Sequence, residues 1–161
     1  LSQFSRQTEN MHELCDVHEI LDNCLVMLHH EVKHKAEVKK DFHPDTLIIN
    51  GNAGKLHQAF LNILINAIQA IHEQGEIRIA TTIEDSRAII VFGDNGIGIP
   101  EKDIKQIFDP FFTRKDVGLG TGLGLSITSS IIRDHQGEVR VRSTPGKGSE
   151  FSIILPLNRK I

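Results

Sequence analysis

The chain has 161 residues, which is the size of one domain with at most a short appendage. Its formal net charge of −3 at pH 7 offers no electrostatic basis for binding nucleic acid, so we expect no nucleic-acid partner. No apolar run approaches the roughly 20 residues that span a bilayer, and the two cysteines show neither metal nor redox spacing. We therefore expect a cytoplasmic domain, cut from a longer protein that other segments could anchor in a membrane.

Hydrophobic periodicity predicts helices and strands in alternation along the chain. We expect a helix over residues 17–34, strands over 36–42 and 47–49, a helix over 53–73, strands over 77–83 and 88–92, a short helix over 100–107, a helix over 122–135, and strands over 138–143 and 149–155. Residues 1–11 are polar and indicate the end of a preceding helix or a linker, with the domain itself over residues 12–161. This order favours an α+β fold, a two-layer α/β sandwich with about three helices on one face of a mixed, mostly antiparallel sheet.

The helix predicted over residues 53–73 is apolar on most sides and carries one narrow polar stripe. The stripe consists of Asn62, Asn66, Gln69 and Glu73, spaced by four, three and four residues. A helix this apolar is buried on most sides, and asparagine is a poor helix former, so these polar groups need partners. Those partners are either neighbouring backbone groups or a ligand, and the helix alone does not decide between them.

Glycine is concentrated in two clusters, at residues 94–100 and 118–125, and seven of the 13 glycines lie between residues 93 and 124. Glycine is justified where the backbone takes a positive φ or approaches a ligand closely. The second cluster leads into an apolar helical pattern, and a glycine-rich loop before a helix N-terminus is a phosphate site. The first follows the strand predicted over residues 88–92 and supplies the Asp94 carboxylate. We therefore expect a nucleotide to bind between the two clusters.

Residues 108–120 fit no regular element, and we expect them to form a mobile lid over the nucleotide. Three aromatic residues lie at its start, Phe108, Phe111 and Phe112. They are either lid anchors that pack differently with and without nucleotide or ordinary core residues, and both interpretations stay open.

Four motifs together resemble a known family. They are Asn62…Asn66-Ala67, Asp94-Asn95-Gly96-Ile97-Gly98-Ile99-Pro100, Phe108-Asp109-Pro110-Phe111-Phe112-Thr113 and Gly120-Thr121-Gly122-Leu123-Gly124-Leu125. In this order they resemble the catalytic, ATP-binding domain of a bacterial two-component sensor histidine kinase of the nitrogen-regulation sensor type, over residues 12–157. That domain has the Bergerat fold, shared with gyrase, the heat-shock chaperone ATPases and the mismatch-repair ATPases. The resemblance implies binding of Mg-ATP and transfer of the γ-phosphate to a histidine of a dimerisation domain, for relay to a response-regulator aspartate.

The resemblance implies that Asp94 recognises adenine. Its carboxylate accepts a hydrogen bond from the exocyclic amine, and Ser149 assists through an ordered water. The physics agrees, because guanine presents a carbonyl at that position and would leave a buried carboxylate unpaired, at a penalty of roughly 1–3 kcal/mol. The alternative is that Asp94 only forms an Asx turn at the strand end, a common role of an Asp-Asn-Gly sequence.

The polar helix stripe then lies at the phosphates. Asn66 resembles the family's magnesium ligand, and its neutral amide oxygen suits a hard cation that also binds nucleotide phosphates. Asn62 stands where the hydrolysing relatives carry a glutamate general base, and an amide cannot take a proton from water, so we expect slow hydrolysis. Gln69 stands where many members carry a phosphate-binding lysine. Because glutamine carries no charge, another cation must neutralise part of the phosphate charge, and Lys115 is the first candidate and Arg114 the second. The alternative is that both are solvated charges on the lid.

The resemblance therefore assigns a complete set of site residues. The nucleotide-binding set is Asn66, Gln69, Asp94, Gly96, Gly98, Ile99, Thr113, Arg114, Lys115, Gly118, Gly120, Thr121, Gly122, Leu123, Gly124, Leu125 and Ser149, with Asn62 and Lys115 as catalytic residues and Asn66 as the Mg²⁺ ligand.

The family phosphorylates a histidine that lies in a His-Glu/Asp motif followed by a proline, on a separate dimerisation helix. His12, His18, His30 and His72 each precede a glutamate but lack that proline, and we expect them to be surface helix residues. The acceptor then lies outside this sequence, and residues 1–6 resemble the end of the second dimerisation helix. We expect this fragment to be monomeric and the whole protein to be a homodimer that passes phosphate to a response-regulator receiver domain.

Two other functions use the same pocket. One is a clamp driven by ATP hydrolysis, as in the chaperone and gyrase ATPases, and the other is a serine kinase of the anti-sigma class. Asn62, the Gly-Thr-Gly-Leu-Gly-Leu form of residues 120–125 and the lack of clamp domains argue against the first. The phenylalanine-rich residues 108–112 and the helix-like residues 1–6 argue against the second.

Overall fold

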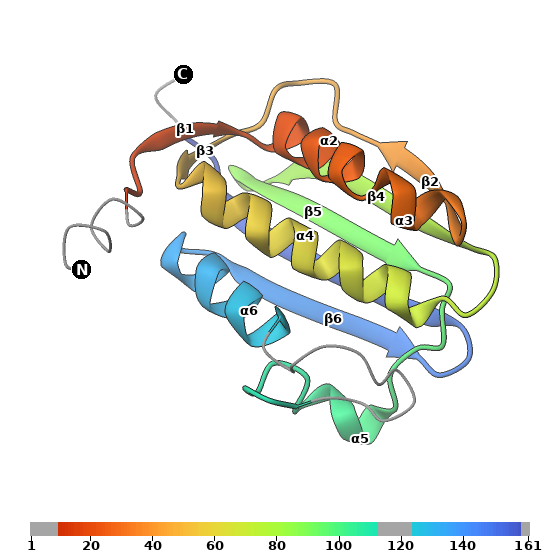
Figure 1. The fold of residues 1–161 in the computed structure, drawn as a ribbon. Coiled ribbons are helices and arrows are strands. Elements are labelled where there is room, and N and C mark those ends of the chain that lie inside the picture. Colours follow the sequence, from red (N-terminus) through yellow and green to blue (C-terminus); the bar gives the residue numbers. More distant parts are fainter. Residues whose placement is uncertain (1–9, 113–123, 159–161) are drawn as a thin grey trace, which may run out of the picture.

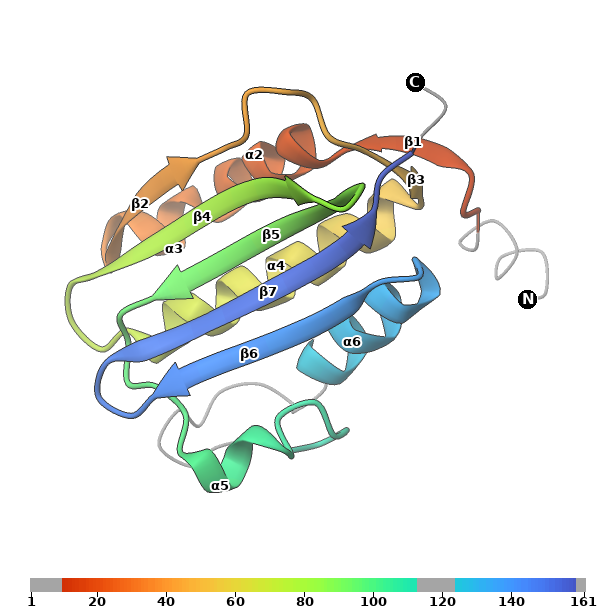
Figure 2. The same ribbon diagram turned by 180° about the vertical axis from the view of Figure 1, so that it is seen from behind.

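The computed structural model describes residues 10–112 and 124–158, which form two layers (Figure 1). In chain order the elements are β1 (Glu13–Asp16), α2 (Val17–Met27), α3 (His29–Lys33), β2 (Ala36–Asp41), β3 (Ile48–Gly51), α4 (Ala53–Ala70), β4 (Gly75–Glu84), β5 (Arg87–Asp94), α5 (Glu101–Ile104), α6 (Gly124–Asp134), β6 (Glu138–Thr144) and β7 (Gly148–Pro156). Helices α2, α4 and α6 cover one face of the main sheet, and Figure 2 shows its other face without a helix.

The main sheet has five strands in the order β2-β4-β5-β7-β6. Strand β2 runs parallel to β4, and the other three pairs are antiparallel. A separate two-stranded ribbon joins β1 to β3. The predicted two-layer sandwich with a mixed, mostly antiparallel sheet is therefore confirmed.

The core lies between α4 and the central strand β5. Phe60 of α4 and Phe92 of β5 are both buried, with ring centroids 5.8 Å apart. Strand β5 reads as one apolar run because both of its faces take apolar residues. Ile90 is buried against the helices, while Ile89 and Val91 are half-buried on the open face of the sheet. This strand delivers Asp94 to the end of the sheet.

The N-terminal segment differs from its prediction in two places. Residues Glu13–Asp16 form strand β1, paired antiparallel with β3, where no strand was predicted. Asp16 caps the next helix, since its Oδ1 accepts a hydrogen bond from the N–H of Glu19 at 3.2 Å. That helix is not continuous over residues 17–34, because Leu28 leaves helical geometry at φ −100° and ψ 7° and separates α2 from α3.

Charged side chains line the two edge strands of the main sheet, β2 and β6. Lys39 of β2 lies 3.1 Å from Glu76 on the neighbouring strand, and Arg142 of β6 donates to Glu150 on the open face of the sheet. Arg140 adds a second exposed cation to β6. A charged edge discourages the addition of another strand.

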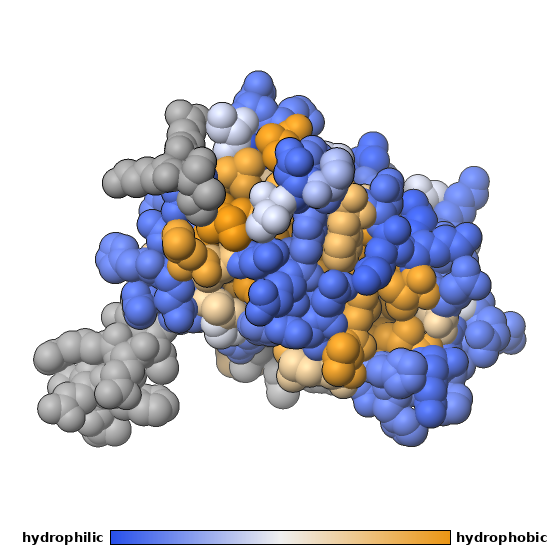
Figure 3. Space-filling view, turned by 90° about the horizontal axis from the view of Figure 1, so that it is seen from above, coloured by the Kyte–Doolittle hydropathy of each residue, from blue (hydrophilic) through white to orange (hydrophobic). Residues whose placement is uncertain are grey.

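Apolar residues reach the surface in patches that hydrophilic residues separate, as the face in Figure 3 shows. The more exposed large apolar side chains of the described residues include Leu14, Val26 and Met27. Single exposed apolar side chains are common on soluble domains. Within residues 10–112 and 124–158, no helix combines the length and apolar character that a membrane span requires.

His135, directly after α6, ties that helix to the start of α4. Its ring is buried, with Nδ1 2.7 Å from the carbonyl oxygen of Ile131 and Nε2 accepting from the N–H of Asn52 at 3.1 Å. Because Nε2 accepts, the neutral ring carries its proton on Nδ1 and donates it to Ile131. A Cβ on Gly51 would overlap this ring, so the contact between His135 and the start of α4 requires glycine at position 51.

We expect Gly51→Ala to lower the Tm by about 3–10 °C, because the ring is held at both nitrogens and overpacking costs roughly 1–3 kcal/mol. Thermal unfolding followed by circular dichroism measures the change. Gly54→Ala is the matched control, since a Cβ there meets only Asn52 Oδ1 at 3.5 Å, and its Tm should stay equal or rise slightly. A Gly51→Ala variant as stable as the wild type would contradict the close packing of Gly51 against the His135 ring.

Candidate functional site

Asp94 ends the central strand β5 and is buried, with 4% of its surface exposed. Its Oδ1 accepts a hydrogen bond from the N–H of Gly96 at 2.8 Å. Burial raises the pKa of Asp94, while the N–H groups of Gly96 and Ser149 and the charge of Arg78 act in the opposite direction. The Asx turn considered as the alternative role is therefore present, and it accounts for one of the two carboxylate oxygens.

The loop after Asp94 is fastened on three sides. Asn95 Oδ1 accepts from the N–H of Glu76 at 2.7 Å, on the β4 side. The N–H of Ile97 donates to the carbonyl of Ala70, the last residue of α4, at 2.9 Å. The carbonyl of Ile97 accepts from the N–H of Gly146 in the β6–β7 turn at 2.7 Å. These bonds fix the loop between the end of α4 and the turn.

Three glycines allow these segments to approach one another. A Cβ on Gly96 would overlap the carbonyl of Ala70, and one on Gly148 would overlap the carbonyl of Asp94. Gly98 has φ +75°, where a side chain is strained, and its Cβ would meet Thr144. At these three glycines the close approach is to protein backbone, and close approach to a ligand stays a prediction.

The polar stripe of α4 leads from the start of α6 to the Asp94 loop. Asn62 Nδ2 donates to the carbonyl of Gly124, the first residue of α6, at 3.1 Å. Asn66 and Gln69 follow at half-buried positions, and α4 then ends at Ala70, which binds the loop. Within the described residues, no hydrogen bond or ion pair engages the side-chain amide of Asn66 or Gln69.

Some predicted site residues lie elsewhere than expected. The stripe does not extend to Glu73, because α4 ends at Ala70 and Glu73 lies exposed in the following turn. Helix α6 begins at Gly124, and Leu125 is half-buried against the core. The assigned residues Thr113, Arg114, Lys115, Gly118, Gly120, Thr121, Gly122 and Leu123 lie outside the described residues.

The three phenylalanines before this segment have different environments. Phe108 packs edge-on against the buried Phe151, with ring centroids 6.3 Å apart, and Phe112 packs half-buried against the core. Phe111 is 72% exposed and has φ +68°. Phe108 and Phe112 thus have core contacts, whereas Phe111 has its ring in solvent.

Two of the four histidines expected on surface helices are not on helices. His12 directly precedes strand β1 and lies before the start of α2, and His72 lies beyond the end of α4, which stops at Ala70 instead of residue 73. His18 is on α2 but half-buried, stacked on Phe42 at 4.6 Å and 2.7 Å from Thr81 Oγ1.

Ser143 of β6 contacts the candidate site although it was not among the predicted site residues. Its Oγ lies 2.8 Å from Ser149 Oγ and accepts from the N–H of Ile99 at 2.7 Å. The alternation along β6 could have predicted this position. Val139 and Val141 alternate with exposed arginines, and Ser143 continues the inward face of the strand.

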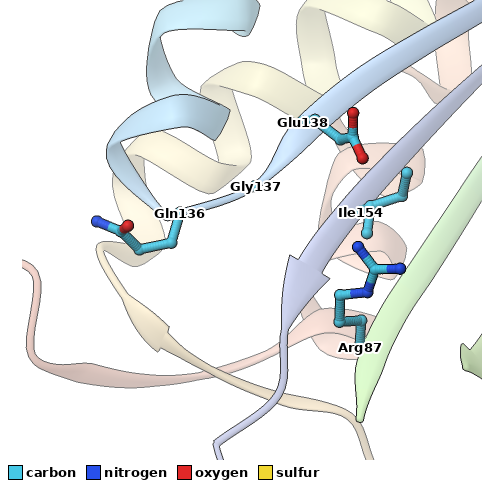
Figure 4. A pocket seen from close by; sticks show the side chains of 5 residues that line it. All are labelled: Arg87, Gln136, Gly137, Glu138 and Ile154. Carbon is cyan, nitrogen blue, oxygen red and sulfur yellow. The ribbon is translucent and has the colours of Figure 1, made fainter. Parts of the chain in front are cut away.

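A shallow hollow of about 160 Å³ lies at the other end of the sheet (Figure 4). It is lined by Arg87, Gln136, Gly137, Glu138 and Ile154. Arg87 begins β5, whereas Asp94 ends it, so the hollow is separate from the carboxylate site. Its volume is below the roughly 300 Å³ of a typical ligand pocket.

Comparison with known proteins shows the class of ATPase-type domains to which this two-layer sandwich belongs. Residues 51–159 match the model of the family described as histidine kinase-, DNA gyrase B-, and HSP90-like ATPase. The match covers more than half of the chain, and the chain belongs to this family.

Individual relatives are sensor kinases. The chain is 41% identical to the signal transduction histidine-protein kinase AtoS of Escherichia coli (strain K12) over 160 residues, which is 98% of this chain and 26% of AtoS. It superposes on the mycobacterial sensor histidine kinase MprB with a TM-score of 0.82 at 27% identity, covering 91% of this chain and 98% of that one. The nucleotide-free catalytic domain of histidine kinase ThkA gives a TM-score of 0.80 at 28% identity, covering 89% and 96%.

These matches confirm the predicted family, and the fold is that of a histidine kinase catalytic domain. The chain spans about a quarter of the length of the curated relative AtoS.

We expect the stability of the Asp94→Asn variant relative to the wild type to depend on pH. An acid whose pKa is raised by folding stabilises the fold below its unfolded pKa, and this contribution is lost as the pH rises through the raised value. Between pH 4 and 7 the Tm difference should therefore shift in favour of Asp94→Asn as the pH rises. The exposed Asp109→Asn variant is the control, and a pH-independent difference for Asp94→Asn would contradict the burial argument.

Proposed function

We propose that this chain binds Mg-ATP and supplies its γ-phosphate to a histidine on a dimerisation domain, for relay to an aspartate of a response-regulator receiver domain. The observation that carries the proposal is the buried Asp94 carboxylate at the end of β5, in a chain of this ATPase family. A carboxylate kept from water at a strand end, with its loop fastened to α4, is suited to a ligand that donates a hydrogen bond.

At the adenine end, Asp94 selects the base. Ionised Asp94 offers only acceptors, so the exocyclic amine of adenine can donate to it, whereas the guanine carbonyl would face it without a proton. Gly96, Gly98 and Ile99 shape the loop beside the base, and Ser149 assists through an ordered water. The pairing of Asp94 with Ser149 across β5 and β7 supports this assignment.

At the phosphate end, the amide stripe of α4 holds the charged groups. Asn66 would hold Mg²⁺, since its amide oxygen is a suitable hard ligand and forms no hydrogen bond within the described residues. Mg²⁺ neutralises phosphate charge when bound. Asn62 binds the start of α6 and cannot act as a general base, which spares the γ-phosphate from hydrolysis.

The other phosphate contacts come from the residues around Asn66 and from the segment before α6. Gln69 donates to phosphate oxygens from its half-buried position on α4. Lys115, helped by Arg114, stabilises the transferring phosphoryl group as its catalytic cation. The remaining contacts are made by Thr113, Gly118, Gly120, Thr121, Gly122, Leu123, Gly124 and Leu125.

The partners follow from the relatives' class. We propose that the whole protein is a homodimer joined through its own phosphoacceptor domain, with residues 1–11 as the end of a dimerisation helix or linker and residues 12–161 as the catalytic domain. The fragment alone would be monomeric. A reducing, cytoplasmic location fits the two free, buried cysteines, Cys15 and Cys24.

We expect calorimetry to detect ATP binding that depends on Mg²⁺, and GTP binding that is at least tenfold weaker. Asp94→Asn replaces an acceptor with a donor and should weaken ATP binding about 10- to 100-fold. Asn66→Ala should remove most of the Mg²⁺ dependence, while Asn23→Ala, at an exposed position of α2, is the matched control. Equal affinity for ATP and GTP would contradict the role of Asp94.

We expect the chain to phosphorylate an added dimerisation domain from its own full-length protein, and the product to be acid-labile as phosphohistidine is. Lys115→Ala should slow this transfer about 100-fold because a cation at the transferring phosphoryl group is lost. Lys147→Ala, an exposed lysine of the β6–β7 turn, should leave the rate unchanged. An acid-stable phosphoserine product would favour the anti-sigma type of serine kinase instead.

A further inference from the structure

Asp94, Ser149 and Ser143 form a row across three neighbouring strands. Asp94 of β5 is the direct partner of Ser149 of β7, and Ser149 is the direct partner of Ser143 of β6. Directly paired residues of antiparallel strands project from the same face of a sheet. All three side chains therefore lie on the helix-covered face, at the end of the sheet that bears the carboxylate.

The hydroxyl of Ser143 makes three contacts with different requirements. It accepts from the N–H of Ile99 at 2.7 Å, and it lies 2.9 Å from the carbonyl of Gly148 and 2.8 Å from Ser149 Oγ. The carbonyl can only accept, so the single proton of Ser143 goes to Gly148. Towards Ser149, Ser143 then has only a lone pair to offer.

The proton of Ser149 is thereby directed away from the pocket. Only if Ser149 donates to Ser143 are all three contacts of Ser143 satisfied, because the reverse direction would set two acceptors 2.9 Å apart at Gly148. The lone pairs of Ser149 are left on the side of Asp94. The row thus offers acceptors alone, from the carboxylate and from the hydroxyl beside it.

We propose that Ser143 is a positioning residue that determines base specificity, by holding the Ser149 hydroxyl as an acceptor. This inference rests on the proposed nucleotide function and extends it to a residue that touches neither base nor phosphate. A ligand group that donates N–H, directly or through a water, matches the row. A carbonyl at the same position meets no proton from Asp94 or Ser149.

The loop after Asp94 contacts the same Ser143 hydroxyl. Ile99 is buried and closes the loop that begins at Asp94, and its N–H occupies one lone pair of Ser143. This bond uses one lone pair of Ser143 and leaves the other for the Ser149 proton, while the Gly148 carbonyl takes the proton of Ser143. The Ser143 hydroxyl is therefore held by the loop and by Gly148 at the same time, which fixes its position beside Ser149.

The test compares ATP with inosine triphosphate, which carries a carbonyl where adenine carries the amine. Affinities of the whole chain for both nucleotides, with Mg²⁺, are measured by competition against a fluorescent ADP analogue. The variants are Ser143→Ala, Ser143→Thr, Ser149→Ala and the double variant, with Ser152→Ala on the open face of β7 as the control for hydroxyl loss. Circular dichroism confirms that each variant is folded.

In Ser143→Ala, the Ser149 proton is free to turn toward a carbonyl, so the ATP-to-inosine-triphosphate affinity ratio should fall about 3- to 10-fold. Ser143→Thr keeps a hydroxyl and should restore the ratio. In the Ser149→Ala background, Ser143→Ala should leave the ratio unchanged. A purely structural role would weaken both nucleotides equally, so an unchanged ratio in a folded Ser143→Ala variant overturns the inference.

The same experiment separates failure of the inference from failure of the proposed function. A wild-type chain that binds ATP, with a ratio insensitive to Ser143, overturns only the role of Ser143. A ratio that falls equally in both backgrounds also overturns it, because Ser143 would then act without Ser149. A wild-type chain that binds neither nucleotide at millimolar concentration overturns the proposed function and the inference together.

Discussion

The site depends on one constraint, a carboxylate held away from water at the end of a central strand. Burial raises the pKa of Asp94, so its charged form needs donors nearby, and the N–H groups of Gly96 and Ser149 provide them. For these donors to reach it, the following loop and the β6–β7 turn must both close on the strand end. Side chains at Gly96 and Gly148 would block that closure. Gly96 of the first cluster and Gly148 of the β6–β7 turn are thus required by the buried acid as well as by any ligand.

Most of the fold could be predicted because its elements bury apolar faces with regular periods. The long apolar face of α4 and the apolar run of β5 determine the layer arrangement, and both were predicted. Strand β1 could not be, since its four residues show no alternation and its partner β3 is more than thirty positions away. The break at Leu28 was missed for a related reason, because the apolar periodicity continues across it.

The candidate site was predictable where a residue type is unusual for its element. Asparagines in an apolar helix and an aspartate after a buried strand are visible in the sequence, and the structure joins them through Ala70 and Ile97. Ser143 is ordinary for its strand, and its importance appears only when the strand register places it beside Ser149. The resemblance to a family supplied the roles of Asn66 and Asp94, whereas the hydroxyl row required the three-dimensional contacts.

The charged edge strands matter for a domain that works beside its own copy. In a homodimer of the kind proposed, linkers would keep two such domains at an effective concentration of about a millimolar, where exposed strand edges tend to pair. Lys39 on one edge and Arg140 and Arg142 on the other oppose such pairing. The two copies would therefore not join their sheets edge to edge. Each catalytic domain could then reorient on its linker independently of the other.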